Sequence, residues 1–262
     1  MNLNIDDKIA LVTGGSKGIG FGIASSLAQE GVGIVLLSRD QKSLFTAKEK
    51  INTEGGEVLD VIQADLSDPY IDTIVDTKLK NINIKPDILI NNTGGPPFGN
   101  LLDHSNDIWY EFFNQNLMSV IKLTKLFSKD MSNKKWGRII NISSTNAIEP
   151  TSEMVISSTL RSAVAAFSKS AALTFAKSGI TINTICPGGV STDRLINLIN
   201  TKAESENSSP EEELKKAEKS IPMERFATPT ELATLVSYLC STNADYLTGQ
   251  VFPFDGGLVK GF

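Results

Sequence analysis

A glycine-rich turn near the N-terminus has the residue types and spacing that bind a phosphate group. It reads Thr-Gly-Gly-Ser-Lys-Gly-Ile-Gly at positions 13–20, between a short apolar run and a helical pattern. Glycines let the main chain approach a pyrophosphate, and a following helix offers free N–H groups and the positive end of its dipole. The G-x-x-x-G-x-G spacing is neither G-x-G-x-x-G nor a Walker loop, so an ordinary tight turn is the alternative. The residues assigned to phosphate contact are Gly14, Ser16, Lys17, Gly18, Ile19 and Gly20.

The next apolar run ends in Ser38-Arg39-Asp40, where a dinucleotide's ribose would lie. A carboxylate at such a strand end binds the 2′-hydroxyl of NAD, whereas an arginine accommodates the 2′-phosphate of NADP. Arg39 together with Lys17 therefore predicts NADP as the cofactor. Asp40, one residue further on, leaves NAD as the alternative, and an arginine that is merely solvated is a further interpretation of Arg39.

The elements that must position these residues alternate between short apolar runs and longer helical patterns. Such alternation predicts βαβ units and a parallel sheet, and near-continuous apolar runs indicate strands covered on both faces. The predicted strands are 9–12, 34–37, 58–62, 88–90, 138–142, 180–185 and 250–254. The predicted helices include 21–29, 41–54, 108–130, 157–176 and 229–240. No internal repeat or linker interrupts the pattern, which predicts a single domain over residues 1–262.

One segment, 201–219, is polar and highly charged. Its Ser-Ser-Pro-Glu-Glu run is typical of a helix start. We expect one or two exposed, mobile helices here. A lid over a substrate site and a solvated surface insertion are both consistent with this composition.

Composition excludes several classes of protein. The formal charge of −5 argues against a broad nucleic-acid surface, which needs clustered lysine and arginine. Cys186 and Cys240 lie in apolar surroundings, and without a CxxC pair or Cys/His cluster neither a metal site nor a disulfide is predicted. The first residues have no apolar signal core, and no apolar run has membrane-spanning length. The sequence therefore predicts a cytoplasmic protein that is not bound to a membrane.

Seven short motifs from residue 13 to residue 257 resemble those of the short-chain dehydrogenase/reductase family. Each is a weak signal alone, but together they occur in the family's order. They are TGGSKGIG (13–20), ADLSD (64–68), NNTGG (91–95), NQNL (114–117), GRIINISS (137–144), CPGGVSTD (186–193) and TGQVFPFDGG (248–257). The chain is most similar to a subgroup resembling β-ketoacyl-ACP reductases with an imperfect catalytic set.

This resemblance implies a doubly wound Rossmann fold, with a seven-stranded parallel sheet and helices on both faces. It also implies a small carbonyl or alcohol substrate and a homotetramer or homodimer. Asp65 and Leu66 would contact the adenine, and Asn92, Thr93 and Gly94 would lie along the coenzyme. The nicotinamide side would be formed by Pro187, Gly188 and Thr192. Thr93 and the Gly-Pro-Pro at 95–97 depart from the family's usual Asn-Asn-Ala-Gly.

The family's proton chemistry uses a tyrosine, a lysine four residues later, a serine and an asparagine. Asn116 matches the asparagine and Ser144 the serine, but Ser157 and Arg161 stand where the tyrosine and lysine belong. A misalignment is excluded, because no tyrosine lies between positions 110 and 238. The resemblance therefore predicts a site without the Tyr-x-x-x-Lys pair.

A serine hydroxyl is a far weaker acid than a phenol, whose pKa is about 10. Arg161 keeps a positive charge at the ribose but does not readily give up its proton. Losing general acid–base catalysis costs roughly 10²–10⁴-fold in rate. One hypothesis is thus a reductase whose proton comes from a water held by Ser144, Ser157 and Asn116. The other is a catalytically impaired coenzyme-binding scaffold or sensor.

Two other side chains are candidate acids. Glu149 follows Ser144 by five positions, on a loop that in this family faces the substrate. A carboxyl group in a dry pocket can have its pKa raised toward neutrality, although a solvated loop carboxylate is the more ordinary interpretation. His104 lies in a polar loop, which predicts exposure to solvent.

Overall fold

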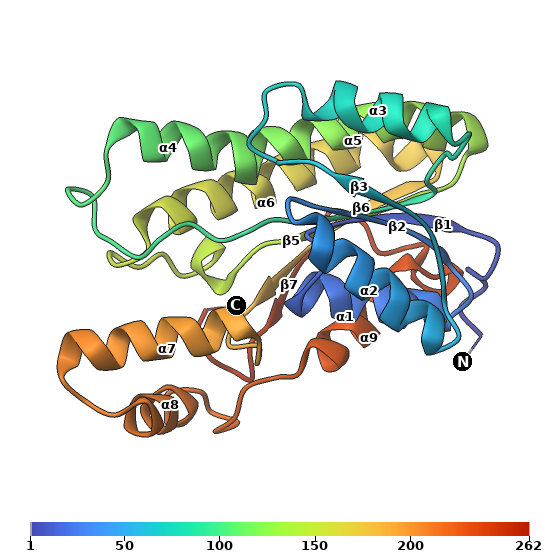
Figure 1. Ribbon diagram of the computed structural model, residues 1–262. Helices are drawn as coiled ribbons and strands as arrows, with labels where there is room; N and C mark the ends of the chain where they lie inside the picture. The colour runs from blue at the N-terminus through green and yellow to red at the C-terminus, as the bar shows by residue number, and fades with distance from the viewer. Residues whose placement is uncertain (1, 262) are drawn as a thin grey trace.

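Seven parallel strands form one sheet in the computed structural model, which describes residues 2–261 (Figure 1). They are β1 (Ile9–Thr13), β2 (Gly33–Ser38), β3 (Glu57–Gln63), β4 (Ile88–Asn92), β5 (Gly137–Ile142), β6 (Ile180–Pro187) and β7 (Val251–Phe254). The spatial order is β3-β2-β1-β4-β5-β6-β7. All seven predicted strands are confirmed, each within two residues at either end.

The strands are apolar along their length because helices cover both faces of the sheet. The helices α1 (Gly18–Gln29), α2 (Gln41–Thr53) and α9 (Pro229–Cys240) pack on one face. On the other face lie α3 (Ile71–Asn81), α5 (Ser119–Lys134) and α6 (Val155–Phe175). This arrangement confirms the predicted doubly wound α/β fold.

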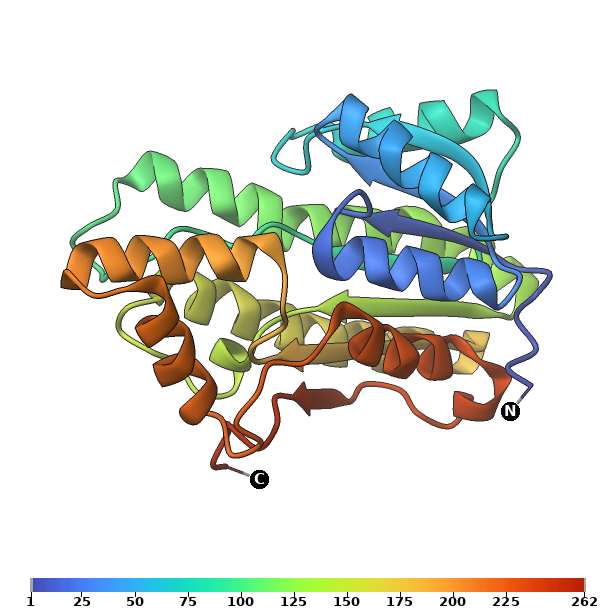
Figure 2. The same ribbon diagram turned by 60° about the horizontal axis from the view of Figure 1, so that its bottom comes forward.

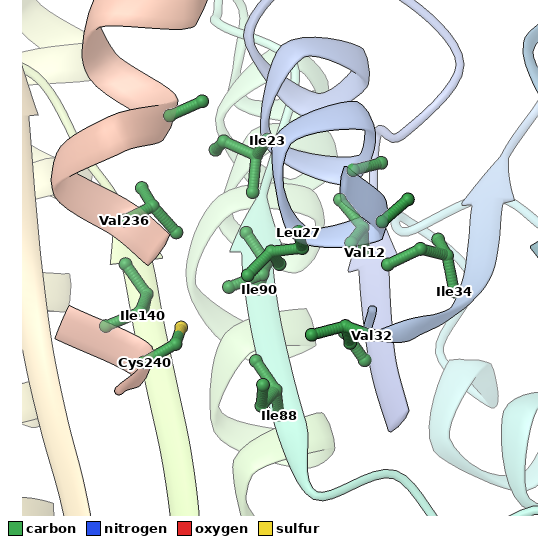
Figure 3. Close-up of a cluster of buried hydrophobic side chains, with 14 of the residues drawn as sticks. Val12, Ile23, Leu27, Val32, Ile34, Ile88, Ile90, Ile140, Val236 and Cys240 are labelled. Atoms are coloured by element: carbon green, nitrogen blue, oxygen red, sulfur yellow. The ribbon is translucent and has the colours of Figure 1, made fainter. Parts of the chain in front are cut away.

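Buried side chains from strands and helices meet between the layers. Ile23 and Leu27 of α1 and Val236 of α9 lie over Ile90 and Ile140 of the central strands (Figure 3). All five are fully buried, and burying such a side chain contributes about 1.5–3 kcal/mol. The central strands are therefore held in place by packing on this face.

The strand order reverses between β1 and β4, which pair with each other in the middle of the sheet. In open α/β sheets such a reversal leaves a crevice at the carboxyl ends of the strands, where ligands bind. Polar side chains tie the two strand ends together here. The Thr13 hydroxyl donates to the Asn92 carbonyl at 3.0 Å, and the Asn92 Nδ2 donates to the Gly14 carbonyl at 3.2 Å.

The predicted helix over 108–130 is wrong as one continuous helix. The chain forms α4 (Asn106–Phe113), a π-helical segment (Asn114–Met118) and then α5. The Ser119 hydroxyl, at the start of α5, donates to the carbonyl of Gln115 in the π-helical segment at 2.6 Å. The apolar pattern did not reveal this change, because the buried residues of the π-helical segment, Gln115 and Asn116, are polar.

The charged segment at 201–219 forms parts of two helices, and the first begins earlier than predicted. These are α7 (Asp193–Glu206) and α8 (Pro210–Lys219). The Ser209 hydroxyl accepts a hydrogen bond from the Glu212 N–H at 3.2 Å, which confirms the helix start at Pro210. The two helices stand beside the carboxyl end of the sheet (Figure 2). Within residues 2–261, no helix is both long enough and apolar enough to cross a membrane.

Candidate active site

A cavity of about 930 Å³ opens at the carboxyl ends of the strands, beside the reversal in strand order. It is walled by the glycine-rich turn, the ends of β2, β4, β5 and β6, and the first turn of α7. Most of the predicted site residues line it, namely Gly14, Ser16, Lys17, Gly18, Ile19, Arg39, Leu66, Asn92, Thr93, Gly94, Ser144, Ser157, Arg161, Pro187, Gly188 and Thr192. Gly20, Asp65 and Asn116 lie just outside its wall.

The glycine-rich turn presents main-chain donors to the cavity. Gly14 and Gly18 have φ angles of +57° and +54°, a region that side chains other than glycine rarely adopt. Lys17 occupies the N-cap position of α1 without a side-chain hydrogen bond to the helix. The first N–H groups of α1 are thus free for an anion. Gly20 has a packing role, because a Cβ there would lie 2.1 Å from the Gly14 carbonyl oxygen.

Just after β2, the Arg39 side chain is free to meet a ligand, whereas the Asp40 carboxylate is used as a helix cap. The Asp40 Oδ1 caps α2 by accepting the Ser43 N–H at 2.8 Å. The Ser43 hydrogen bonds hold the pKa of Asp40 below its usual value. Asp65 uses Oδ1 in a turn with Ser67 at 2.9 Å, while its Oδ2 lies 3.8 Å from the Arg39 Nη1. The Arg39 side chain is 65 % exposed, so it can turn toward a ligand.

Ser144 and Ser157 lie at the other end of the cavity. Ser144 follows β5, and its Oγ accepts the Asn146 N–H at 3.2 Å at the start of a short 3₁₀ turn. Ser157 lies in the first turn of α6 and is buried. Both line the cavity, so two hydroxyl groups are brought to the end away from Lys17.

Arg161 is a buried cation one turn further along α6. Its Nη1 donates to the Ile142 carbonyl at 2.8 Å and its Nη2 to the Thr93 carbonyl at 3.3 Å. Its Nε has no hydrogen-bond partner among the residues described. Burial, and then the positive charge of Arg194, lower the pKa of Arg161 to about 10. The guanidinium thus ties β5 to the loop after β4.

Asn116 lies behind the cavity wall, within the π-helical segment. Its Nδ2 donates to the carbonyl oxygen of Gly94, a lining residue, at 3.0 Å. The side chain is fully buried, and its Oδ1 has no partner in the described part of the chain.

The two candidate acids lie elsewhere. The Glu149 Oε1 accepts the N–H groups of Lys260 and Gly261 at 2.6 and 3.3 Å, so this carboxylate holds the C-terminal segment. The expectation that Glu149 faces the substrate is not met, because it does not line the cavity. The prediction of an exposed His104 is wrong, since its ring is half-buried against Gly99 with a buried Nε2.

Sequence reasoning missed Arg194, a cation that lines the cavity together with Arg161. It lies in the first turn of α7, directly after Thr192, whose hydroxyl accepts the Leu195 N–H at 3.3 Å. The Arg194 Nη1 donates to the Gly95 carbonyl at 3.0 Å and its Nη2 to the Pro96 carbonyl at 3.1 Å. The signal available in the sequence was its place immediately after the CPGGVSTD motif.

The fold and the cavity define a Rossmann-type α/β oxidoreductase. Residues 14–259 match the family model described as enoyl-(acyl carrier protein) reductase. The chain belongs to the short-chain dehydrogenase/reductase family, as its motifs predict.

Relatives match along almost the whole chain. The uncharacterized oxidoreductase YvaG of Bacillus subtilis is 32% identical and is covered over 99% of both chains. The 3-oxoacyl-[acyl-carrier-protein] reductase FabG of Aquifex aeolicus is 31% identical over 98% of this chain and all of its own. Among solved structures, L-sorbose reductase from Gluconobacter frateurii, complexed with NADPH and L-sorbose, superposes with a TM-score of 0.95 at 28% identity, covering 100% of both chains.

Proposed function

We propose that this chain is an NADP-dependent reductase that interconverts a small carbonyl compound and its alcohol. One observation carries the proposal. A single cavity joins the free N-terminus of α1, beside Lys17 and Arg39, to the hydroxyl groups of Ser144 and Ser157. One end fits a phosphorylated dinucleotide and the other fits a carbonyl oxygen.

The residues present fit the coenzyme. The glycine-rich turn and the first turn of α1 would hold the pyrophosphate. Leu66, Asn92 and Gly188 would border the rest of the molecule. NADP is favoured over NAD because Asp40 is used as a helix cap while Arg39 stays exposed. The NADPH complex of L-sorbose reductase supports this preference. When bound, the reduced nicotinamide supplies a hydride.

We further propose an altered site in which Ser157 and Arg161 replace the family's tyrosine and lysine. The hydroxyl groups of Ser144 and Ser157 would donate to the carbonyl oxygen as the hydride reaches the carbonyl carbon. The proton on that oxygen then comes from a water molecule, for which the buried Asn116 Oδ1 offers an acceptor. Arg161 keeps the positive charge near the developing negative oxygen.

The first experiment is a titration of the purified protein with NADPH and with NADH, followed by calorimetry. We expect micromolar binding of NADPH and an affinity for NADH that is about tenfold or more weaker. A preference for NADH would mean that Asp40 determines the coenzyme. The absence of binding to either coenzyme would overturn the oxidoreductase proposal.

The second candidate function is a coenzyme-binding scaffold or sensor. This function is favoured by Ser157 and Arg161, which stand where the family has its tyrosine and lysine. The double substitution Ser157→Tyr with Arg161→Lys separates the two functions. In an impaired relative it should raise turnover of simple ketones. An enzyme that takes its proton from a bound water should lose activity instead, because the side chain of the introduced tyrosine fills the space of that water.

Finally, we propose that residues 1–262 form a single domain, located in the cytoplasm, which assembles into a homodimer or homotetramer. The outer surface of α4 and α6 supports assembly. Tyr110 is 68 % exposed and Leu173 is 74 % exposed. Burying such apolar side chains against a second copy of the chain would be favourable.

A further inference from the structure

Arg161 and Arg194 line the same cavity, and we call them the arginine pair. Arg161 reaches from α6 and Arg194 from α7, and both donate to carbonyl oxygens of one short loop after β4. The acceptors are Thr93 for the first arginine and Gly95 with Pro96 for the second. Across residues 2–261, no carboxylate lies within 4.0 Å of either guanidinium.

This arrangement is unfavourable without a ligand. A buried guanidinium bound only to neutral carbonyl groups keeps its full charge, and removing that charge from water is costly. The lowered pKa of Arg161, caused first by burial and then by Arg194, reflects the same cost. The Nε of Arg161 has no acceptor in the described chain, and Arg194 is exposed to solvent. The pair therefore retains capacity for an anion.

The coenzyme's phosphates do not account for this anion. Lys17 and Arg39 lie at the glycine-rich end, where the pyrophosphate and the 2′-phosphate would be. Arg161 lies one turn beyond Ser157 on α6, at the end with Ser144, where a reduced nicotinamide brings no charge. Arg194 donates to the same loop that Arg161 contacts. The two acidic side chains in the cavity wall are Asp40, which caps α2, and Asp193, at the N-terminus of α7. A negative group bound beside Arg161 would therefore belong to the substrate.

We propose that the arginine pair binds a carboxylate of the carbonyl substrate, which makes the substrate an oxo acid and the product a hydroxy acid. The planar fork of an arginine matches both oxygens of a carboxylate. Ser144 and Ser157 would contact the neighbouring oxo group. The hydride adds to the oxo carbon, a proton from water adds to its oxygen, and the carboxylate is unchanged. This inference rests on the proposed reductase function.

The test measures binding to the protein saturated with NADP⁺, so that no turnover occurs. Acetoacetate and 2-oxobutanoate are titrated by calorimetry, each against its uncharged methyl ester. We expect the acids to bind about tenfold or more tightly than the esters, because charge-assisted hydrogen bonds are about twice as strong as neutral ones. This preference should shrink as sodium chloride is raised, since Arg194 is exposed.

Three variants test whether Arg194 causes the tighter binding of acids than of esters. Arg194→Gln should abolish the preference for acids and leave the NADPH dissociation constant within about twofold. Gly95→Ala keeps both charges, but its Cβ would fall 2.4 Å from the Arg194 Nη2, so we expect a partial loss of preference. Arg225→Gln is the matched control, because Arg225 pairs with Glu231 outside this cavity and should change neither affinity.

The possible outcomes distinguish the oxo-acid proposal from the reductase proposal. Acids that bind no more tightly than their esters, or do not bind, overturn the oxo-acid proposal while NADPH binding leaves the reductase proposal standing. An Arg194→Gln variant that loses NADPH affinity as strongly as acid affinity assigns the charge to a coenzyme phosphate and also overturns it. A protein that binds no NADPH overturns the reductase function itself, and the oxo-acid inference with it.

Discussion

Arg39 is the side chain on which the coenzyme preference depends most directly. It is 65 % exposed and its contact with Asp65 is long, at 3.8 Å, so little has to be broken before it meets a 2′-phosphate. An exposed ion pair of this length contributes at most about 1 kcal/mol. The cationic side chain is therefore free to act on a ligand rather than on stability.

We predict that Arg39→Ala weakens NADPH binding by about 10- to 100-fold, since hydrogen bonds to charged groups contribute about 1.5–3 kcal/mol. NADH affinity should stay within about twofold, because NADH lacks the 2′-phosphate. Calorimetry with both coenzymes measures this. Lys48→Gln is the control and should change neither affinity, because Lys48 is a half-buried cation of α2 that does not line the cavity. Equal losses for NADPH and NADH would show that Arg39 does not read the 2′-phosphate.

At Ser144 the expected effect is on turnover and not on coenzyme binding. The hydroxyl faces the cavity end with Ser157 and Arg161. Removing one hydrogen-bond donor to a developing oxyanion costs roughly 10²–10³-fold in rate. Ser144→Ala should therefore lower kcat by about that factor on an accepted carbonyl substrate. NADPH affinity, measured by fluorescence, should be unchanged, and a parallel loss of that affinity would contradict the assignment.

At the scale of elements, the N-terminus of α9 tests how much a charged capping residue stabilises the fold. Thr228 and Glu231 form a capping box, in which the Glu231 Oε2 accepts the Thr228 N–H at 2.8 Å. Arg225 also pairs with this carboxylate at 2.7 Å. Arg225, and then the Thr228 N–H, lower the pKa of Glu231 to about 2.

A carboxyl group with a lowered folded-state pKa stabilises the fold above its unfolded pKa of 4.5, and this stability disappears as the pH falls toward 2. Glu231→Gln keeps the hydrogen-bond acceptor and removes the charge. We predict that the wild-type protein has the higher urea midpoint at pH 6 and that the gap narrows between pH 4.5 and pH 3. Glu204→Gln on exposed α7 is the control. If the difference in urea midpoint between the wild type and Glu231→Gln is the same at pH 6 and pH 3, the charge of Glu231 is not its cause.

The five inner strands were predictable because they are buried on both faces and hence largely apolar, as Leu11 and Ile140 illustrate. The edge strands β3 and β7 are partly exposed. The break at Asn114–Met118 was not predictable, because its buried residues, Gln115 and Asn116, are polar and do not enter an apolar pattern. The glycine-rich turn was found because its local conformation demands glycine, at Gly14 for example. Arg194 was missed because its partners, Gly95 and Pro96, are distant in sequence and offer only main-chain oxygens.

At the scale of the whole molecule, the outer surface of the helical layer opposite α1 has no partner within the described chain. Leu173 lies near the end of α6 and is 74 % exposed, although its neighbours Ala171 and Ala172 are buried. Exposing a leucine to this extent gives up most of the roughly 1.5–3 kcal/mol that its burial contributes. A second copy of the chain packed on α6 would recover that free energy.

We therefore predict that Leu173→Asp shifts the protein to a smaller assembly, measured by size-exclusion chromatography with light scattering. A charge at the centre of an interface must be removed from water on association, which costs several kcal/mol. Thr46→Asp is the control, because Thr46 is exposed on α2, which covers the opposite face of the sheet. Both variants should keep the wild-type thermal midpoint when dilute, since neither side chain is buried within one chain. If the wild type is already monomeric, or if Leu173→Asp leaves the mass unchanged, α6 is not an assembly surface.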